Sequence, residues 1–200
     1  RVDYDPEPLG LDNPTPAFFW KPVGEGRDRR QSSYRIFVAS SPDKLEEPDI
    51  WDSDEIDSAE NAGVPYEGPT LTSAAEYWWT VRLRDEEGRL SPPAAPVRFV
   101  TGLLDPRDWQ AKWIGTGPSD EPRLDVSTHM DADSVKEQFP ELRLDETGVL
   151  LCREFQCPSP VRRAFVFVCG LGYYVLHLNG RRVGNAVLNP AKTDYRKRVL

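Results

Sequence analysis

The chain has 200 residues, of which 38% are hydrophobic and 10% aromatic, enough to form the core of one large domain or of two ordinary ones. Its formal net charge of −8 argues against nucleic acid and anionic membranes as partners, because both select clustered Lys and Arg. Nowhere do 18 apolar residues run together. The first residues carry neither an initiating Met nor a signal-peptide core, so a cytoplasmic location is only a working expectation and export stays open.

Residues 1–104 carry short apolar runs separated by Pro, Gly, Asp and Ser, without a helical period, which is typical of an all-β sandwich. Alternation in 34–39 and 77–84 predicts two strands with one core face each. The core-facing residues would be Tyr34, Ile36 and Val38 in the first strand, and Tyr77, Trp79, Val81 and Leu83 in the second. The Pro-rich stretch 91–96 by itself could pass for a linker.

The spacing from Leu71 to Tyr77 resembles the fibronectin type III module, in which a Tyr anchors a corner between the two sheets. The resemblance implies that Tyr77 is a corner residue whose hydroxyl bonds to the backbone, and not a ligand platform. The alternation turns Trp78 to the opposite face, where it is a candidate contact with other domains.

A second β pattern begins at residue 109. The predicted strands are 109–115, 150–155, 161–169, 173–178 and 181–188. An acidic, Pro-containing segment at 116–147 interrupts them as an insertion or loop, with a short helix possible at 134–139. Asn179-Gly180 predicts a type I′ hairpin turn, and alternation sets Tyr174, Leu176 and Leu178 on one strand face.

Catalytic, metal and disulfide signatures are weak throughout. Cys152, Cys157 and Cys169 are odd in number, and Cys152 and Cys169 read as small buried thiols in strands, so we expect no disulfide framework, no metal and no cofactor. Two clusters of acidic residues could be mistaken for a catalytic acid pair, but we interpret them as solvated or capping side chains. One cluster is Asp52, Asp54 and Glu55, and the other is Asp131 and Asp133. No Gly-x-Ser-x-Gly nucleophile motif occurs.

An ordered series of motifs spans nearly the whole chain. It includes Tyr66-Glu67-Gly68, Tyr77-Trp78-Trp79, Trp109-x-Ala111-x-Trp113-Ile114-Gly115, Leu151-x-Arg153-x-Phe155, Gly170-Leu171-Gly172-Tyr173-Tyr174 and Leu188-x-Pro190-x-x-Thr193-x-Tyr195. In this order the motifs resemble the N-terminal region of bacterial α-L-rhamnosidases of glycoside hydrolase family 78. The resemblance implies a fibronectin type III-like sandwich at 1–104, whose last strand at 97–101 directly follows the Pro-rich stretch, so the domain boundary lies near residue 104. An incomplete jelly roll would follow at 105–200, and its remaining strands would follow Leu200 or come from a partner.

The resemblance also implies that the parent enzyme hydrolyses terminal α-L-rhamnosides with inversion. Inversion needs two carboxyl groups about 6.5–9.5 Å apart, and in this family they lie in a downstream (α/α)₆ barrel. No catalytic residue is therefore expected in this chain. The partners implied are a rhamnoside-containing glycan or glycoside, through the parent enzyme, and the downstream domains of the same protein; an oligomer is also possible.

Sugar binding by the second domain stays open, because jelly-roll modules often stack an aromatic side chain on a sugar ring. The candidate residues are Tyr173, His177, Asn179, Asn189, Asp194 and Tyr195. Each has a structural alternative in the strand, the turn or the segment beside Pro190. The alternative functions are a stand-alone carbohydrate-binding or cell-surface adhesion module, and a β-glycosidase of another family, which would not explain the motifs of the first domain.

Overall fold

A computed structural model of the chain describes residues 1–24, 30–115, 150–157, 159–161, 163–190 and 193–194. Its regular elements are ten β-strands and two short 3₁₀ turns, η1 (Pro42–Lys44) and η2 (Pro106–Asp108), which confirms the all-β prediction. No helix in this described part is long and apolar enough to cross a membrane. The contacts divide the chain into two compact units, Arg1–Trp109 with Arg163–Leu200, and Gln110–Arg162.

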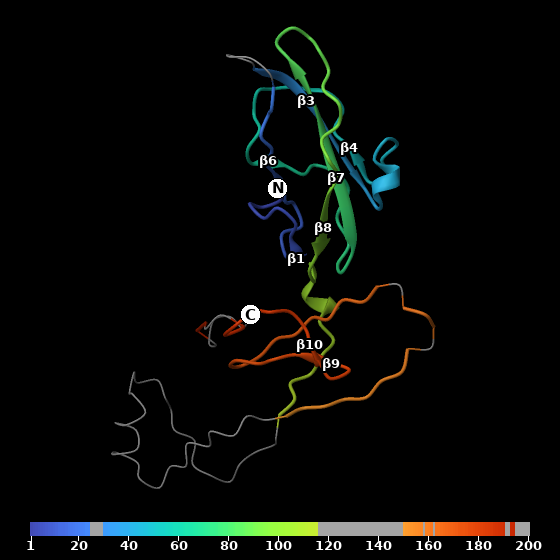
Figure 1. Cartoon of the computed structure of the whole chain (residues 1–200), viewed down its shortest axis with the longest axis vertical. Coiled ribbons are helices and arrows are strands. Elements are labelled where there is room, and N and C mark those ends of the chain that lie inside the picture. The colour runs from blue at the N-terminus through green and yellow to red at the C-terminus, as the bar shows by residue number, and fades with distance from the viewer. Residues whose placement is uncertain (25–29, 116–149, 158, 162, 191–192, 195–200) are drawn as a thin grey trace, which may run out of the picture. The chain divides into compact units, whose positions relative to one another are not determined.

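The main sheet is built around two long antiparallel strands, β3 (Gln31–Ala39) and β7 (Glu76–Asp85), which cross the centre of the upper part of Figure 1. On the other side of β7 lies β8 (Val97–Thr101), which pairs in parallel with β1 (Leu9–Leu11). On the other side of β3 lie two short strands, β4 (Trp51–Asp52) and β5 (Ile56–Asp57). The strands predicted at 34–39, 77–84 and 97–101 are confirmed.

The second sheet of the sandwich is the antiparallel pair β2 (Ala17–Phe18) and β6 (Val64–Pro65). Phe18 is fully buried and packs on Trp79 of the main sheet, with ring centroids 4.6 Å apart. The predicted core faces of β3 and β7 are confirmed, because Tyr34, Ile36, Val38, Tyr77, Trp79 and Val81 are all buried in one cluster and Leu83 packs against it. Burial of these side chains is the main stabilising contribution of the sandwich.

The corner predicted at Tyr77 is present. Its hydroxyl accepts a hydrogen bond from the backbone N–H of Thr72 at 2.8 Å. The ring is buried and stacks on Phe99, with centroids 5.3 Å apart, and Leu71 is buried in the same core. Tyr77 therefore ties the loop before β7 to the sheet, as the fibronectin type III resemblance implied.

The Pro-rich stretch 91–96 runs alongside β7. The backbone N–H of Ser91 donates to the carbonyl of Leu83 at 2.8 Å, and that of Ala94 donates to Val81 at 3.0 Å. The Thr80 hydroxyl donates to the Ala94 carbonyl at 2.6 Å. Prolines lack an N–H, so the pairing is irregular, but the stretch belongs to the sandwich and is not a linker.

The hairpin predicted at Asn179-Gly180 is confirmed. Strands β9 (His177–Leu178) and β10 (Arg181–Arg182) pair antiparallel, and the two turn residues have φ of 50° and 74°. A type I′ turn requires positive φ at both positions, which Asn and Gly tolerate best. The strands are shorter than the predicted 173–178 and 181–188, although the N–H of Val183 still reaches the carbonyl of Leu176 at 2.8 Å.

The strands predicted at 109–115, 150–155 and 161–169 are wrong for the residues that the structure describes, which have no strand there. Apolar alternation alone cannot form a strand, because each N–H and C=O also needs a pairing partner. Several of the apolar side chains are exposed instead, including Trp113 at 65% and Phe155 at 66%. The jelly roll thus stays a prediction, and the acidic segment at 116–147, with the helix at 134–139, lies outside the described residues.

Candidate functional site

The first candidate site is the hairpin at β9 and β10. Tyr173 is 62% exposed and His177 is exposed, whereas Tyr174 and Leu176 between them are half-buried, as the alternation predicts. Leu178 of the same alternation is 48% exposed, because it directly precedes the turn, where the strand pair ends. Asn179 is exposed and occupies the first turn position.

The remaining sugar candidates follow the hairpin. The backbone carbonyl of Asn189 accepts a hydrogen bond from the N–H of Tyr174 at 3.0 Å, and the peptide bond to Pro190 is cis. Asp194 is exposed, and Tyr195 lies outside the described residues. The structure thus joins Asn189 through the backbone to Tyr174, the neighbour of Tyr173, and a sugar contact by the side chains of Asn189 and Tyr173 stays a prediction.

The acidic residues near β4 and β5 are held by arginines. Asp52 accepts a hydrogen bond from Nε of Arg35 at 2.7 Å, and this bond lowers the pKa of Asp52. Glu55 pairs with Arg84 and accepts the Ser33 hydroxyl at 2.7 Å, which together lower the pKa of Glu55 to about 2. A general acid for glycoside hydrolysis needs a raised pKa, so these carboxylates suit permanent ion pairs and not proton transfer.

Metal chemistry finds no support in the described residues, where no group of three or more His, Cys, Asp or Glu side chains could hold a metal ion. Cys152 and Cys157 are exposed, Cys169 is half-buried, and none of these three described cysteines forms a disulfide. The expectation of a buried thiol is therefore wrong for Cys152, because residues 150–155 form no strand that packs into a core.

The outer face of the main sheet, opposite the core, carries a second apolar cluster. Phe37 and Ala39 of β3 and Leu45 are buried there, and Trp78 of β7 packs against them. The predicted outward orientation of Trp78 is thereby confirmed, although its own chain already covers it in part. Its indole Nε1 donates to Glu76 at 3.3 Å. This face therefore carries aromatic side chains next to a charged side chain that is held by a hydrogen bond.

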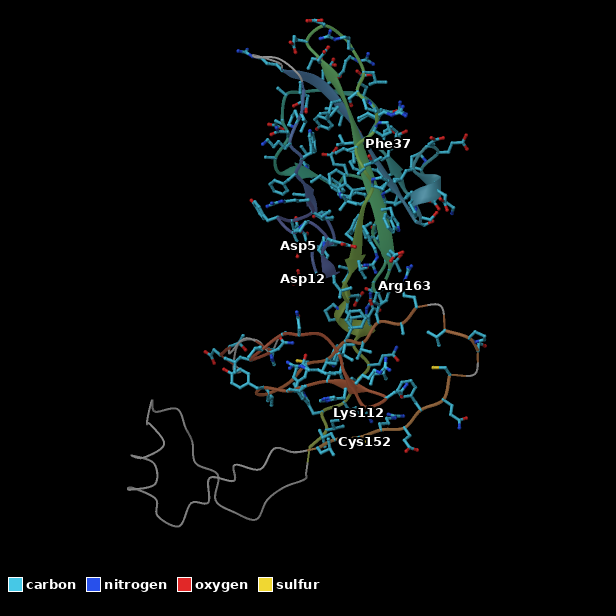
Figure 2. All side chains as sticks on the ribbon, in the orientation of Figure 1. Asp5, Asp12, Phe37, Lys112, Cys152 and Arg163 are labelled. Carbon is cyan, nitrogen blue, oxygen red and sulfur yellow. The ribbon has the colours of Figure 1, made fainter. Side chains whose placement is uncertain are left out.

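Beside that cluster lies a small concavity, which we call the Phe37 concavity. Phe37, labelled in Figure 2, lies beneath two arginines, with Cζ of Arg35 and of Arg82 at 5.3 and 5.9 Å from the ring centroid. The volume is about 110 Å³, and the lining residues are Ser33, Tyr34, Arg35, Phe37, Glu55, Arg82, Arg84 and Leu90. Arg35 and Arg82 lie directly opposite one another across β3 and β7.

Sequence reasoning missed this concavity. The alternation in 77–84 sets Arg82 and Arg84 away from the core, and the alternation in 34–39 does the same for Arg35 and Phe37. Only the register between the two strands brings these four side chains together, and a single sequence does not specify that register. The available signal was the set of basic, outward positions in the two long strands, Arg35 in one and Arg82 and Arg84 in the other.

Two family models match the chain. One, described as "Rha78A-like, N-terminal immunoglobulin domain", matches residues 1–105, and one described as "Alpha-L-rhamnosidase N-terminal domain" matches residues 159–200. The first assigns the sandwich to the immunoglobulin type, which shares its architecture with fibronectin type III modules.

Curated relatives match over almost the entire chain. An α-L-rhamnosidase of Formosa agariphila is 35% identical over 96% of the chain, and one of Streptomyces avermitilis is 31% identical over 98%. The chain spans only 20% and 19% of these two proteins, about one fifth of their length.

Two solved structures resemble the fold. The Streptomyces avermitilis α-L-rhamnosidase complexed with L-rhamnose superposes with a TM-score of 0.56 at 42% identity, over 57% of this chain and 11% of that one. The α-L-rhamnosidase of Dictyoglumus thermophilum gives 0.55 at 32% identity, over 57% and 13%. Three observations indicate the same family: the ordered motifs, the Tyr77 corner and the family model over residues 1–105. The chain therefore belongs to the Rha78A-like family and is an α-L-rhamnosidase N-terminal region built on an immunoglobulin-type sandwich.

Proposed function

We propose that this chain is the non-catalytic accessory region of an α-L-rhamnosidase. The whole protein would remove terminal α-L-rhamnosyl units, with inversion, from a rhamnoside-containing glycan or glycoside. The observation that carries this proposal is the match of 96% of the chain to a Formosa agariphila α-L-rhamnosidase of which it spans only 20%. Catalytic residues would then lie in the part of the protein that this chain does not include.

The chemistry of the described residues supports an accessory role. An inverting glycosidase needs one protonated and one ionised carboxyl group about 6.5–9.5 Å apart. Asp52 and Glu55 both have a lowered pKa and both are bound to arginines. They remain ionised at neutral pH and cannot serve as the acid. The resemblance to family 78 rhamnosidases implies that the acid and the base lie in a helical (α/α)₆ barrel elsewhere in the protein.

We propose that the accessory region braces this catalytic domain. The boundary between its two domains is set near residue 104, and the end of the first family model at residue 105 supports it. Contacts with the rest of the protein would use Trp78 on the outer face and the exposed apolar side chains of the second domain, such as Trp113 and Phe155. Large exposed apolar side chains often mark such interfaces.

Expression of the full reading frame that contains this chain tests the proposal. The protein should release p-nitrophenol from p-nitrophenyl α-L-rhamnopyranoside and not from the β-D-glucopyranoside. NMR of the first product should show the inverted anomer. Lack of α-L-rhamnoside hydrolysis by a folded full-length protein would overturn the assignment. Removal of residues 1–104 should lower the melting temperature while leaving KM nearly unchanged if the role is structural.

Titration of the 200-residue chain with L-rhamnose separates the accessory role from a stand-alone carbohydrate-binding module. Tyr173 is 62% exposed and is the strongest stacking candidate, and Tyr4, 75% exposed elsewhere, provides a matched control. Saturable binding that Tyr173→Ala removes and Tyr4→Ala preserves would favour the binding module. Absence of binding by the folded chain favours the accessory role.

A further inference from the structure

The Phe37 concavity on the outer face of the main sheet has the chemistry of a carboxylate site. We propose that it receives one acidic side chain, Asp or Glu, from another part of the whole protein. This inference rests on the proposed function, because it requires that the chain be part of a longer polypeptide. It goes beyond that function by naming a docking point and the group that docks there.

Charge is the first argument. The residues that line the concavity include three guanidinium groups, from Arg35, Arg82 and Arg84, and a single carboxylate, from Glu55. Asp52 balances the charge of Arg35, and Glu55 balances that of Arg84. An anion that entered the concavity would therefore meet one guanidinium group to which no carboxylate of the described residues is bound, that of Arg82.

The second argument is that only one of these arginines lacks a carboxylate partner. Arg35 is bound to Asp52 and lies 3.9 Å from Asp54, and Arg84 is bound to Glu55. Among the ion pairs of the described residues, none includes Arg82. Arg82 faces Arg35 directly across two paired strands, but the carboxylates beside Arg35 are bound to Arg35, so Arg82 is the guanidinium group left to bind a further anion.

The third argument is that the site is pre-organised. The ring of Phe37 is only 7% exposed and forms a fixed platform under Arg82, whose Cζ lies 5.9 Å from the ring centroid. Ser33, which is 1% exposed, holds Glu55 through its hydroxyl at 2.7 Å. A guanidinium fixed in this way presents a planar fork that matches both oxygens of a carboxylate.

The small volume of the concavity limits which group can bind there. The volume of about 110 Å³ is well below the roughly 300–1,000 Å³ of typical small-molecule pockets. It suits the carboxylate and one or two methylenes of a single side chain better than a complete sugar ring. The relatives extend over about five times the length of this chain, so most of such a protein lies outside it and could supply that side chain.

NMR titration of the 200-residue chain tests the site directly. The probe is the α-amide of N-acetyl-L-glutamic acid, and its glutamine counterpart is the uncharged control. We expect a saturable shift of the backbone amide signal of residue 37 with the glutamate probe only, because every variant keeps this signal, and a shift of the Arg82 Nε–H signal as well in the unsubstituted chain. The dissociation constant should rise at least about tenfold in Arg82→Gln, because the fork is lost, and less in Arg82→Lys, which keeps the charge. Arg107→Gln, at an arginine paired with Asp105 away from the concavity, should change nothing.

The outcomes divide clearly. Equal binding by Arg82→Gln, equal binding of both probes, or no saturable shift would overturn the site. Tighter binding of D-glucuronate than of the glutamate probe would mean that the site takes a sugar acid, and would overturn the side-chain occupant. If Arg82→Gln does not fold, Arg82→Lys and Phe37→Leu decide the question. The rhamnoside assay reports on the proposed function independently, so either inference can fail alone.

Discussion

Replacement of Tyr77 by Phe tests the corner that organises the sandwich. The change removes one hydroxyl, which accepts the Thr72 N–H at 2.8 Å, and keeps the buried ring that stacks on Phe99. Loss of a hydrogen bond costs about 0.5–1.5 kcal/mol, and an unsatisfied donor costs about 1–3 kcal/mol. Thr72 is itself exposed, so water can reach its amide in part. We therefore expect a loss of about 1–2 kcal/mol of unfolding free energy.

The assay is urea unfolding followed by tryptophan fluorescence, since Trp79 lies in the core. A loss of this size corresponds to a melting temperature roughly 5–10 °C lower for a domain of about 100 residues. Tyr77→Ala, which also removes the ring, should cost about 3–5 kcal/mol.

Tyr34→Phe is the matched control for the corner. Tyr34 is also buried in the core, at 5% exposure, and within the described residues its hydroxyl makes no hydrogen bond. We expect its loss to be below about 0.5 kcal/mol. If Tyr77→Phe and Tyr34→Phe are equally stable, the corner bond does not stabilise the sandwich and the reasoning is refuted.

Three further changes probe other parts of the sandwich. A Cβ added at Gly68 would lie 2.6 Å from Cγ of Trp51, so Gly68→Ala should cost about 1–3 kcal/mol by overpacking, measured as a shift of the urea midpoint without a change in slope. Trp79→Phe removes a buried indole N–H that has no partner, so calorimetry should report a loss of about 1 kcal/mol or less, against about 3–5 for Trp79→Ala. The hydrogen bond from Arg35 lowers the pKa of Asp52, and the bonds from Arg84 and Ser33 lower the pKa of Glu55 to about 2. The stability that these two ion pairs contribute is therefore present above the ordinary pKa values of the carboxyl groups and is lost as the pH falls toward the folded-state values. Melting scans should therefore decline below about pH 4.5, and a flatter acid limb is expected in the Asp52→Asn, Glu55→Gln double variant.

Local patterns in the sequence determined much of the first domain and the hairpin turn of the second. Alternation identified the core faces of β3 and β7, because side chains in a strand point to opposite faces with a period of two residues. The spacing of Leu71 and Tyr77 indicated the corner, and Asn179-Gly180 indicated the hairpin turn, because few residue types tolerate positive φ. Each of these features depends on residues that are close in sequence.

Features that depend on distant segments were decided by the tertiary structure alone. The strands expected at 150–155 and 161–169 are absent from the described residues, because a strand forms only where a partner satisfies its backbone groups. The Phe37 concavity arises from the register that sets Arg35 opposite Arg82, 47 positions apart in the chain by their numbers. A one-residue slip would move Arg82 to the other face, so the site exists only because core packing fixes that register.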